Sequence, residues 1–194
     1  MAQPPHFDMD GAIYFVTTRL KEEGRLLTEY QAQIVQRTIL DLSNWEEREE
    51  REAKASPTQA SPTQFLLTHA SENSLKGRGD FSRPSRIREL MLYAYVIMPN
   101  HVHILLKPIN NGISKTMQLI KGRASRHINQ GNLWQKGFFD FMILTEEKFK
   151  VKFNYIHYNP VKWGLVERAE DYKYSSAMEY KVRYGEVFYG EGRL

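Results

Sequence analysis

Residues 90–108 contain two apolar, β-prone runs around a short turn, and this pattern restricts the fold more than any other part of the chain. The runs are Tyr93–Met98 and Val102–Leu106, and Pro99 and Asn100 lie between them. Proline and asparagine favour tight turns, and the flanking residue types are enriched in strands. The stretch therefore predicts an antiparallel β-hairpin.

His101 and His103 belong to the second strand of this hairpin. Because side chains alternate between the two faces of a strand, both imidazoles should share one face with Lys107. Val102 and Ile104 should line the other face. Neutral imidazole nitrogens at this spacing can bind one metal ion. A half-buried strand can also carry two histidines with no metal role, so the pair alone does not decide between these interpretations.

The chain has 194 residues, of which 41% are hydrophobic, and this is enough to bury a core. We expect one domain over residues 1–194, with a low-complexity insertion at residues 44–88. The insertion contains an acidic run, Glu46–Glu52, and the tandem repeat Ser-Pro-Thr-Gln that begins at Ser56 and Ser61. Such a composition indicates a loop with little chemistry of its own.

The formal net charge is +4 and the isoelectric point is about 9.2. Because acidic residues concentrate in the run Glu46–Glu52, the rest of the chain is distinctly basic. There is no cysteine, so disulfides and thiolate zinc sites are excluded. No apolar run has the length to cross a bilayer, and residues 1–5 lack the pattern of a signal peptide, so we expect a cytoplasmic protein.

Two segments before the insertion have regular patterns. Ala12–Leu20 is rich in β-branched and aromatic residues and predicts a strand that pairs next to the hairpin. Thr28–Leu42 begins with a capping residue and continues with apolar residues at helical spacing. It predicts a helix that packs on one face of the sheet.

A basic helix is predicted after the hairpin, from Ser114 to about Asn129. Its apolar stripe consists of Met117, Ile120, Ala124 and Ile128. The cations elsewhere on the helix have few carboxylates to balance them, so we expect a surface that contacts phosphates rather than only solvent. The candidate phosphate-binding residues on this helix are Lys121, Arg123 and Arg126.

A strand at Phe138–Leu144 precedes a helix that Thr145 caps. The residues of this helix with core spacing are Phe149, Phe153 and Ile156. The residues along another face are Lys148, Lys152, Tyr155 and Asn159. Pro160 disfavours a helical conformation at the residue before it, so we expect the helix to end at Asn159. An amide oxygen at that position can complete a metal shell begun by two histidines, with Tyr155 beside the same ion.

Three motifs occur in order along the chain. They are PNHVHILL at Pro99–Leu106, LWQKGFFD at Leu133–Asp140 and NYIHYNPVKWGLV at Asn154–Val166. Together they resemble the single-tyrosine transposases of the HUH class, and most of all the REP-associated tyrosine transposases. The resemblance covers the strand near the N-terminus and nearly everything from Leu90 to Tyr180. It is specific because all three motifs occur in this order, whereas a short motif alone is a weak signal.

The resemblance implies a role for four residues. His101 and His103 match the two metal-binding histidines of the family, and Tyr155 matches its nucleophilic tyrosine in a Tyr-Ile-x-x-Asn-Pro motif. Asn159 matches the polar third metal ligand one turn later. All four of these residues are present in the chain.

The resemblance also implies an α+β fold, the HUH endonuclease fold, in which helices pack on a ferredoxin-like antiparallel sheet. The predicted element order agrees with this fold. The sequence departs from relatives at Phe141, where a basic residue or histidine is common, and at Leu144, where an arginine is common. These differences affect DNA contacts from the strand but not the metal chemistry. The insertion has no counterpart in compact relatives.

The implied chemistry is tyrosine-dependent cleavage of single-stranded or hairpin DNA. A tyrosine hydroxyl, with an ordinary pKa of about 10, is a weak nucleophile at neutral pH, so a divalent cation that polarises the scissile phosphate is needed. We expect Mg²⁺ or Mn²⁺ as the cofactor. By the resemblance, attack by Tyr155 gives a 5′-phosphotyrosine link and a free 3′-hydroxyl. The candidate DNA-binding residues are Lys148, Lys152, Arg123, Lys121 and Arg126.

Other interpretations stay open at the level of sequence. A histidine-triad nucleotide hydrolase also uses a His-apolar-His strand, but it needs a third histidine where Leu105 stands. A metal-dependent hydrolase would use activated water and would not need the Tyr155 hydroxyl. A non-catalytic module derived from a transposase would bind hairpin DNA without cutting it. The sequence also leaves both a monomer and a homodimer open.

Overall fold

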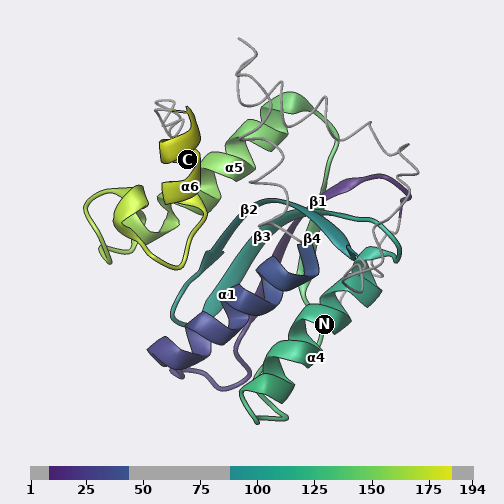
Figure 1. Cartoon of the computed structure of the whole chain (residues 1–194), viewed down its shortest axis with the longest axis vertical. Coiled ribbons are helices and arrows are strands. Elements are labelled where there is room, and N and C mark those ends of the chain that lie inside the picture. The colour runs from purple at the N-terminus through teal and green to yellow at the C-terminus, as the bar shows by residue number, and fades with distance from the viewer. Residues whose placement is uncertain (1–8, 44–87, 185–194) are drawn as a thin grey trace, which may run out of the picture.

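The computed structural model describes residues 9–43 and 88–184. The predicted insertion at residues 44–88 therefore lies outside the described residues except for Arg88. The elements, shown in Figure 1, are β1 (Ile13–Arg19), α1 (Glu29–Ser43), β2 (Leu90–Ile97), β3 (His101–Pro108), α4 (Ile113–His127), β4 (Phe139–Ile143), α5 (Glu146–Lys162), a 3-10 turn (Ala169–Asp171) and α6 (Ala177–Tyr184). Each predicted strand and helix is present, with bounds that differ by a few residues. Within the described ranges, no helix has both the length and the apolar character needed to cross a membrane.

The four strands form one antiparallel sheet in the order β2-β3-β1-β4. The predicted hairpin is confirmed: β2 pairs with β3, and the Met98 backbone N–H donates to the His101 carbonyl at 2.8 Å across the turn. β1 pairs with β3, next to the hairpin as predicted. Across this pair Thr17 lies opposite His103 and Arg19 lies opposite His101. The predicted α+β fold, an antiparallel sheet with helices packed on it, is confirmed.

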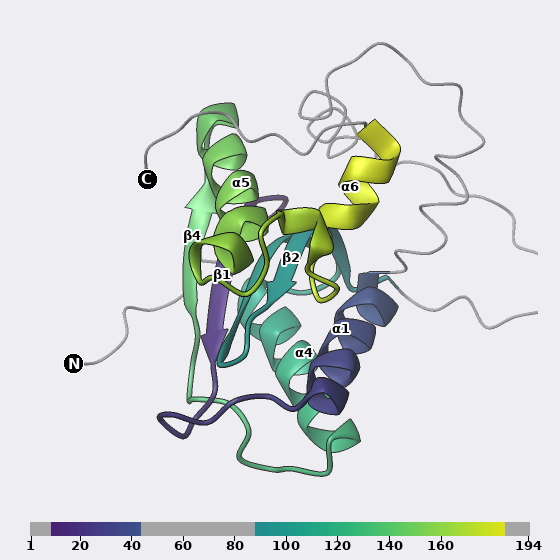
Figure 2. The ribbon, with the colours of Figure 1, turned by 90° about the vertical axis from the view of Figure 1, so that its left-hand side faces the viewer.

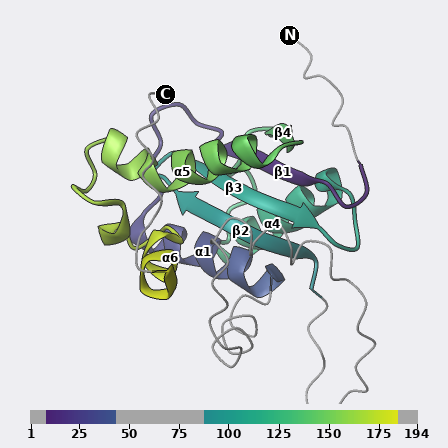
Figure 3. The same ribbon diagram turned by 90° about the horizontal axis from the view of Figure 1, so that it is seen from above.

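Helices cover both faces of the sheet. Figure 2 shows α1 and α4 side by side on one face, and Figure 3 shows α5 crossing the other. Val35 of α1 and Ile120 of α4 are buried on the first face, and Phe149 and Ile156 of α5 are buried on the second. Removal of each such side chain from water contributes roughly 1.5–3 kcal/mol to folding. The buried apolar faces of these helices therefore hold the layers together.

α5 extends to Lys162, so the prediction that it ends at Asn159 is wrong. Pro160 has no N–H, and the helix loses one hydrogen bond there. The donors that follow still reach back into the helix: the Trp163 N–H donates to the Asn159 carbonyl at 3.1 Å, and the Leu165 N–H donates to the Pro160 carbonyl at 2.9 Å. The loss of one bond is not enough to end the helix. Asn159 consequently lies inside the last turns of α5, where its side chain is buried.

A buried polar contact fixes α5 on the sheet. His157 of α5 has no exposed surface, and its Nε2 lies 2.8 Å from the Ser176 hydroxyl. The same hydroxyl oxygen accepts the Tyr95 backbone N–H at 3.0 Å. Since Tyr95 belongs to β2, this contact links the helix, the sheet and the segment before α6.

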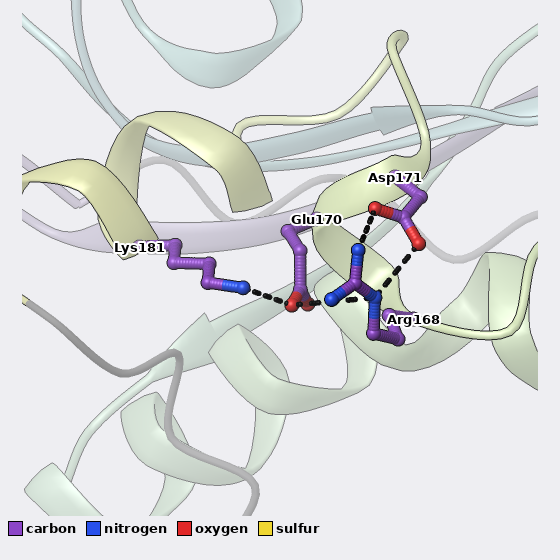
Figure 4. Close-up of polar contacts among 4 residues, drawn as sticks. All are labelled: Arg168, Glu170, Asp171 and Lys181. Atoms are coloured by element: carbon purple, nitrogen blue, oxygen red, sulfur yellow. Dashed lines mark hydrogen bonds and ion pairs between the residues drawn. The ribbon is translucent and has the colours of Figure 1, made fainter.

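An ion-pair group holds the segment that follows α5. Figure 4 shows Glu170 between Lys181 of α6 and Arg168, with Arg168 also bound to Asp171. The Arg168 guanidinium donates two hydrogen bonds to the Asp171 carboxylate, at 2.8 and 2.9 Å. These contacts join the 3-10 turn to α6. They therefore fix the segment between α5 and α6.

Candidate active site

His101, His103 and Tyr155 lie together on the sheet face that α5 covers. The ring centroids of the two histidines are 4.6 Å apart, and those of His103 and Tyr155 are 5.2 Å apart. Phe15 of β1 stacks on His103 at 5.3 Å and meets the Tyr155 ring edge-on at 5.8 Å. The structure therefore brings the predicted nucleophile to the predicted metal-binding pair.

Each imidazole has a hydrogen-bond partner at Nδ1. Nδ1 of His103 lies 2.8 Å from the Thr17 hydroxyl, and Nδ1 of His101 lies 2.6 Å from Oδ1 of Asn100. When Nδ1 donates its proton to these oxygens, the tautomer leaves a lone pair on Nε2. Such partners commonly orient histidines that bind metals. With Nδ1 bound to Thr17 and Asn100, both rings could bind a cation through Nε2.

The histidines are neutral at physiological pH. Burial, together with a smaller effect from the nearby charge of Arg19, lowers the pKa of His101 to about 4. Burial likewise lowers the pKa of His103 to about 3, with smaller effects from the charges of His101, Arg19 and Lys152. A neutral imidazole is the form that binds a metal ion.

Two buried atoms of the predicted metal ligands lack a hydrogen-bond partner among the described residues. Asn159 is 2% exposed, and its Oδ1 has no hydrogen-bond partner among the described residues. Nε2 of His103 is likewise buried and without a hydrogen-bond partner in this part of the chain. A buried polar atom without a partner costs roughly 1–3 kcal/mol, so these atoms suit a ligand that enters the site. Two imidazole nitrogens and one amide oxygen fit Mn²⁺ or Mg²⁺.

A cavity of about 510 Å³ opens beside these residues. Tyr155 and His103 line it, together with the cationic side chains of Arg19, Lys136 and Lys152. No aspartate or glutamate is among its lining residues. The cavity is therefore complementary in charge to a phosphodiester.

The predicted DNA-binding residues divide into two groups. Lys152 lines the Tyr155 cavity, and Lys148 precedes it by one turn on α5. Lys121, Arg123 and Arg126 lie on α4, which packs on the opposite face of the sheet. The structure does not bring these three residues to Tyr155, and their contact with DNA stays a prediction.

Lys121 has a contact that its sequence pattern does not indicate. Its ammonium group donates to the carbonyls of Gln135 and Gly137, at 2.7 and 2.6 Å, and burial lowers its pKa. The segment that it holds, Gln135–Phe138, forms a wall of the Tyr155 cavity. Lys121 therefore supports the shape of the candidate active site from the other side of this wall.

Several residues of the site were missed by the sequence analysis. They are Phe15, Thr17, Arg19, Lys136 and Phe139. Their strands are recognisable from the sequence, but the register that places Thr17 opposite His103 depends on the pairing of distant segments. The motif LWQKGFFD, the second of the three sequence motifs, contains Lys136 and Phe139 and is the signal that could have identified them.

Part of the chain is similar in sequence to known transposases. Residues 81–159, less than half of the chain, match the family model described as "Transposase IS200 like". The REP-associated tyrosine transposase of Escherichia coli (strain K12) is 28% identical over 93 residues, which is 47% of this chain and 56% of the relative. A second curated relative, from Haemophilus influenzae, is 27% identical over 99 residues, which is 43% of this chain and 56% of the relative. The matched region thus spans just over half the length of these relatives.

A solved structure, described as a REP-associated tyrosine transposase bound to a REP hairpin, has a similar fold. Its TM-score to this chain is 0.64 at 19% sequence identity, over 100% of this chain and 99% of that one. These matches confirm the resemblance that the three sequence motifs indicate.

Proposed function

The chain resembles the REP-associated tyrosine transposases, and from this premise we propose that it cuts and rejoins single-stranded DNA beside hairpins. The observation that carries the proposal is the position of Tyr155 next to the His101 and His103 pair, at a cavity that no carboxylate lines. Because no carboxylate lines the cavity, a phosphodiester can enter it without charge repulsion. Tyr155 lines the same cavity, and its hydroxyl can attack the phosphorus.

In the proposed reaction the Tyr155 hydroxyl is the nucleophile. A bond forms between its oxygen and phosphorus, and the bond from phosphorus to the 3′ oxygen breaks. The proton that the phenol loses is balanced by the proton that the 3′ oxygen takes up. The products are a 5′-phosphotyrosine link and a free 3′-hydroxyl. Because no water is consumed, a 3′-hydroxyl can attack the link and rejoin the strand.

His101, His103 and Asn159 would hold Mg²⁺ or Mn²⁺ in this proposal. When bound, the ion polarises the scissile phosphate and offsets the negative charge that develops during attack. Thr17 orients His103 by its hydrogen bond, and the buried Oδ1 of Asn159 supplies a hard oxygen ligand.

The neighbours of Tyr155 restrict its ring. Phe15 and His103 both contact it in edge-on geometry, and Lys152 Nζ lies 5.6 Å from its centroid. This packing limits the rotamers of the side chain and so keeps the hydroxyl ready for attack. Because the tyrosine and the histidines meet within one chain, the arrangement supports a reaction in which a single chain supplies all of these groups.

Hairpin-forming DNA is the proposed substrate. The solved structure of similar fold is described as bound to a REP hairpin, and we extend that ligand class to this chain. The proposal includes the single-stranded DNA that flanks the hairpin, since the cavity at Tyr155 suits one extended strand rather than a duplex.

The test is a search for a covalent adduct. The purified chain is incubated with labelled hairpin oligonucleotides that carry single-stranded flanks, in Mn²⁺, in Mg²⁺ or in a chelator, and is analysed by denaturing electrophoresis. We expect a metal-dependent protein–DNA band in the wild type and none in Tyr155→Phe. The matched control is Tyr158→Phe, at an exposed tyrosine on the same helix, which should retain the band.

Two outcomes would overturn the proposal in different ways. Cleavage that persists in Tyr155→Phe would indicate attack by water, as in a metal-dependent hydrolase. Tight binding of hairpins without cleavage under any metal condition would indicate a DNA-binding module instead.

A further inference from the structure

β4 exposes two aromatic rings at the edge of the sheet. Phe139 is 57% exposed and Phe141 is 39% exposed. In the register of the sheet, Phe139 lies opposite Thr17, which in turn lies opposite His103. Because paired residues project on the same side of a sheet, the two phenyl rings share the face that carries the candidate active site. Large apolar side chains that are exposed next to such a site indicate a surface that binds a ligand.

A free cation lies beside these rings. Lys152 Nζ is 4.6 Å from the Phe15 centroid and 5.6 Å from the Phe141 centroid. Lys152 pairs with no carboxylate in the described part of the chain, and its side chain lines the cavity together with Phe139 and Tyr155. Its three ring contacts hold the ammonium group in place by cation–π attraction. The ammonium group is thus positioned for an anion that enters the cavity.

We propose that Phe139 and Phe141 form a stacking platform for an unpaired nucleobase, and that Lys152 binds the phosphate of the same stretch of DNA. The inference rests on the proposed function and specifies how the strand next to the cleaved bond is held. Aromatic rings stack on any base, and a lysine contacts any phosphate, so the platform holds a strand without reading its sequence. The cavity of about 510 Å³ lies in the size range of sites that enclose a small ligand such as one nucleotide.

Charge favours DNA over a second copy of the chain as the occupant. Arg19, Lys136 and Lys152 line the cavity beside Phe139, and no carboxylate is present there to balance them. A copy docked through the same face would bring like charges together, which is unfavourable. A polyanion with flat apolar bases satisfies both the rings and the cations.

The test measures binding separately from cleavage. Affinity for fluorescent hairpin oligonucleotides with single-stranded flanks is measured by anisotropy in a chelator, and an abasic site replaces each flanking nucleotide in turn. We expect one abasic position to weaken binding of the wild type by roughly 5- to 100-fold, the range for one stacked base. Phe139→Ala should show the same loss with intact DNA and no further loss at that abasic position.

Two other variants complete the design. Leu144→Ala, at an apolar residue that is 76% exposed just after β4 and does not line the cavity, is the matched control and should bind as the wild type does. Lys152→Gln should weaken binding to all sequences alike and lower the slope of log affinity against log salt by about 1. Phe139 is exposed, so its replacement should leave the circular dichroism melting curve unchanged.

The outcomes separate this inference from the proposed function. If Phe139→Ala binds intact and abasic DNA as the wild type does, the platform is wrong, while a covalent adduct at Tyr155 would still support the proposed function. If the wild type binds no hairpin DNA, both are wrong. If sedimentation shows a wild-type dimer that Phe139→Ala dissociates without a change in DNA affinity, the rings form an interface between copies and the platform is also wrong.

Discussion

The hydroxyl of Thr17 lies 2.8 Å from Nδ1 of His103, although the two residues are 86 positions apart in the sequence. They meet because β1 and β3 pair in a register that puts them directly opposite each other. A hydrogen bond to the far nitrogen fixes the orientation and tautomer of a metal-binding histidine. The relationship therefore makes β1, which carries none of the predicted ligands, part of the proposed metal site.

Thr17→Val tests this role. The change removes the hydroxyl and keeps the shape of the side chain, so the affinity for Mn²⁺ should fall by about 10- to 100-fold, as measured by titration calorimetry. Thr18→Val is the control, since Thr18 is buried and its hydroxyl has no partner among the described residues. It should leave the Mn²⁺ affinity unchanged. Equal affinity in Thr17→Val and the wild type would remove Thr17 from the site.

Asn159→Leu should separate folding from metal binding. The buried Oδ1 of Asn159 lacks a hydrogen-bond partner in the described part of the chain, so its replacement by an apolar group of similar size should not destabilise the metal-free protein. The melting temperature without metal should stay the same or rise. Mn²⁺ stabilises the wild type because it binds only the folded state, and this stabilisation should be lost in the variant. A full Mn²⁺-induced rise in the variant would show that Asn159 is not a ligand.

The hairpin, the histidine pair and the tyrosine helix could be predicted because their signals are local. The alternation of residues around Pro99 and Asn100 depends only on neighbours in the chain, and helical spacing already separates Phe149 and Phe153 from Tyr155. The contact of Tyr155 with His103 followed from three motifs found together. Where the structure depends on a local pattern of residues, it can be predicted from the sequence alone.

The remaining parts of the site depend on long-range packing. Helical spacing identifies the basic residues of α4, but it does not say which face of the sheet the helix covers. The sequence therefore could not show that Arg126 and Tyr155 belong to helices on opposite faces of the sheet. The position of Thr17 depends on strand register. The end of α5 was placed too early because the bias against helix before Pro160 is weak compared with burial of Asn159 and Pro160 in the folded protein.

Ser176→Ala should weaken the attachment of α5 to the sheet. The variant leaves the buried His157 Nε2 and the Tyr95 N–H without their partner, and each unsatisfied group costs roughly 1–3 kcal/mol. We expect the free energy of unfolding, measured with urea, to fall by about 2 kcal/mol or more. Ser125→Ala on α4 serves as the control and should change the free energy of unfolding little. A Ser176→Ala protein as stable as the wild type would show that apolar packing alone holds α5.

Alkaline unfolding should report on Tyr172. Burial raises its pKa to about 12, and its hydroxyl donates to the Ile97 carbonyl at 2.9 Å. A tyrosine in the unfolded chain has a pKa of about 10, so the contribution of Tyr172 to stability is complete below that pH and is lost as the pH rises toward 12.

Tyr172→Phe lacks this hydrogen bond and should be less stable by about 1 kcal/mol at pH 8. The difference between wild type and variant, measured by urea unfolding, should then shrink with rising pH, with Tyr30→Phe as a correction for the general effect of base. A difference that stays constant up to pH 12 would mean that Tyr172 ionises alike in the folded and unfolded states.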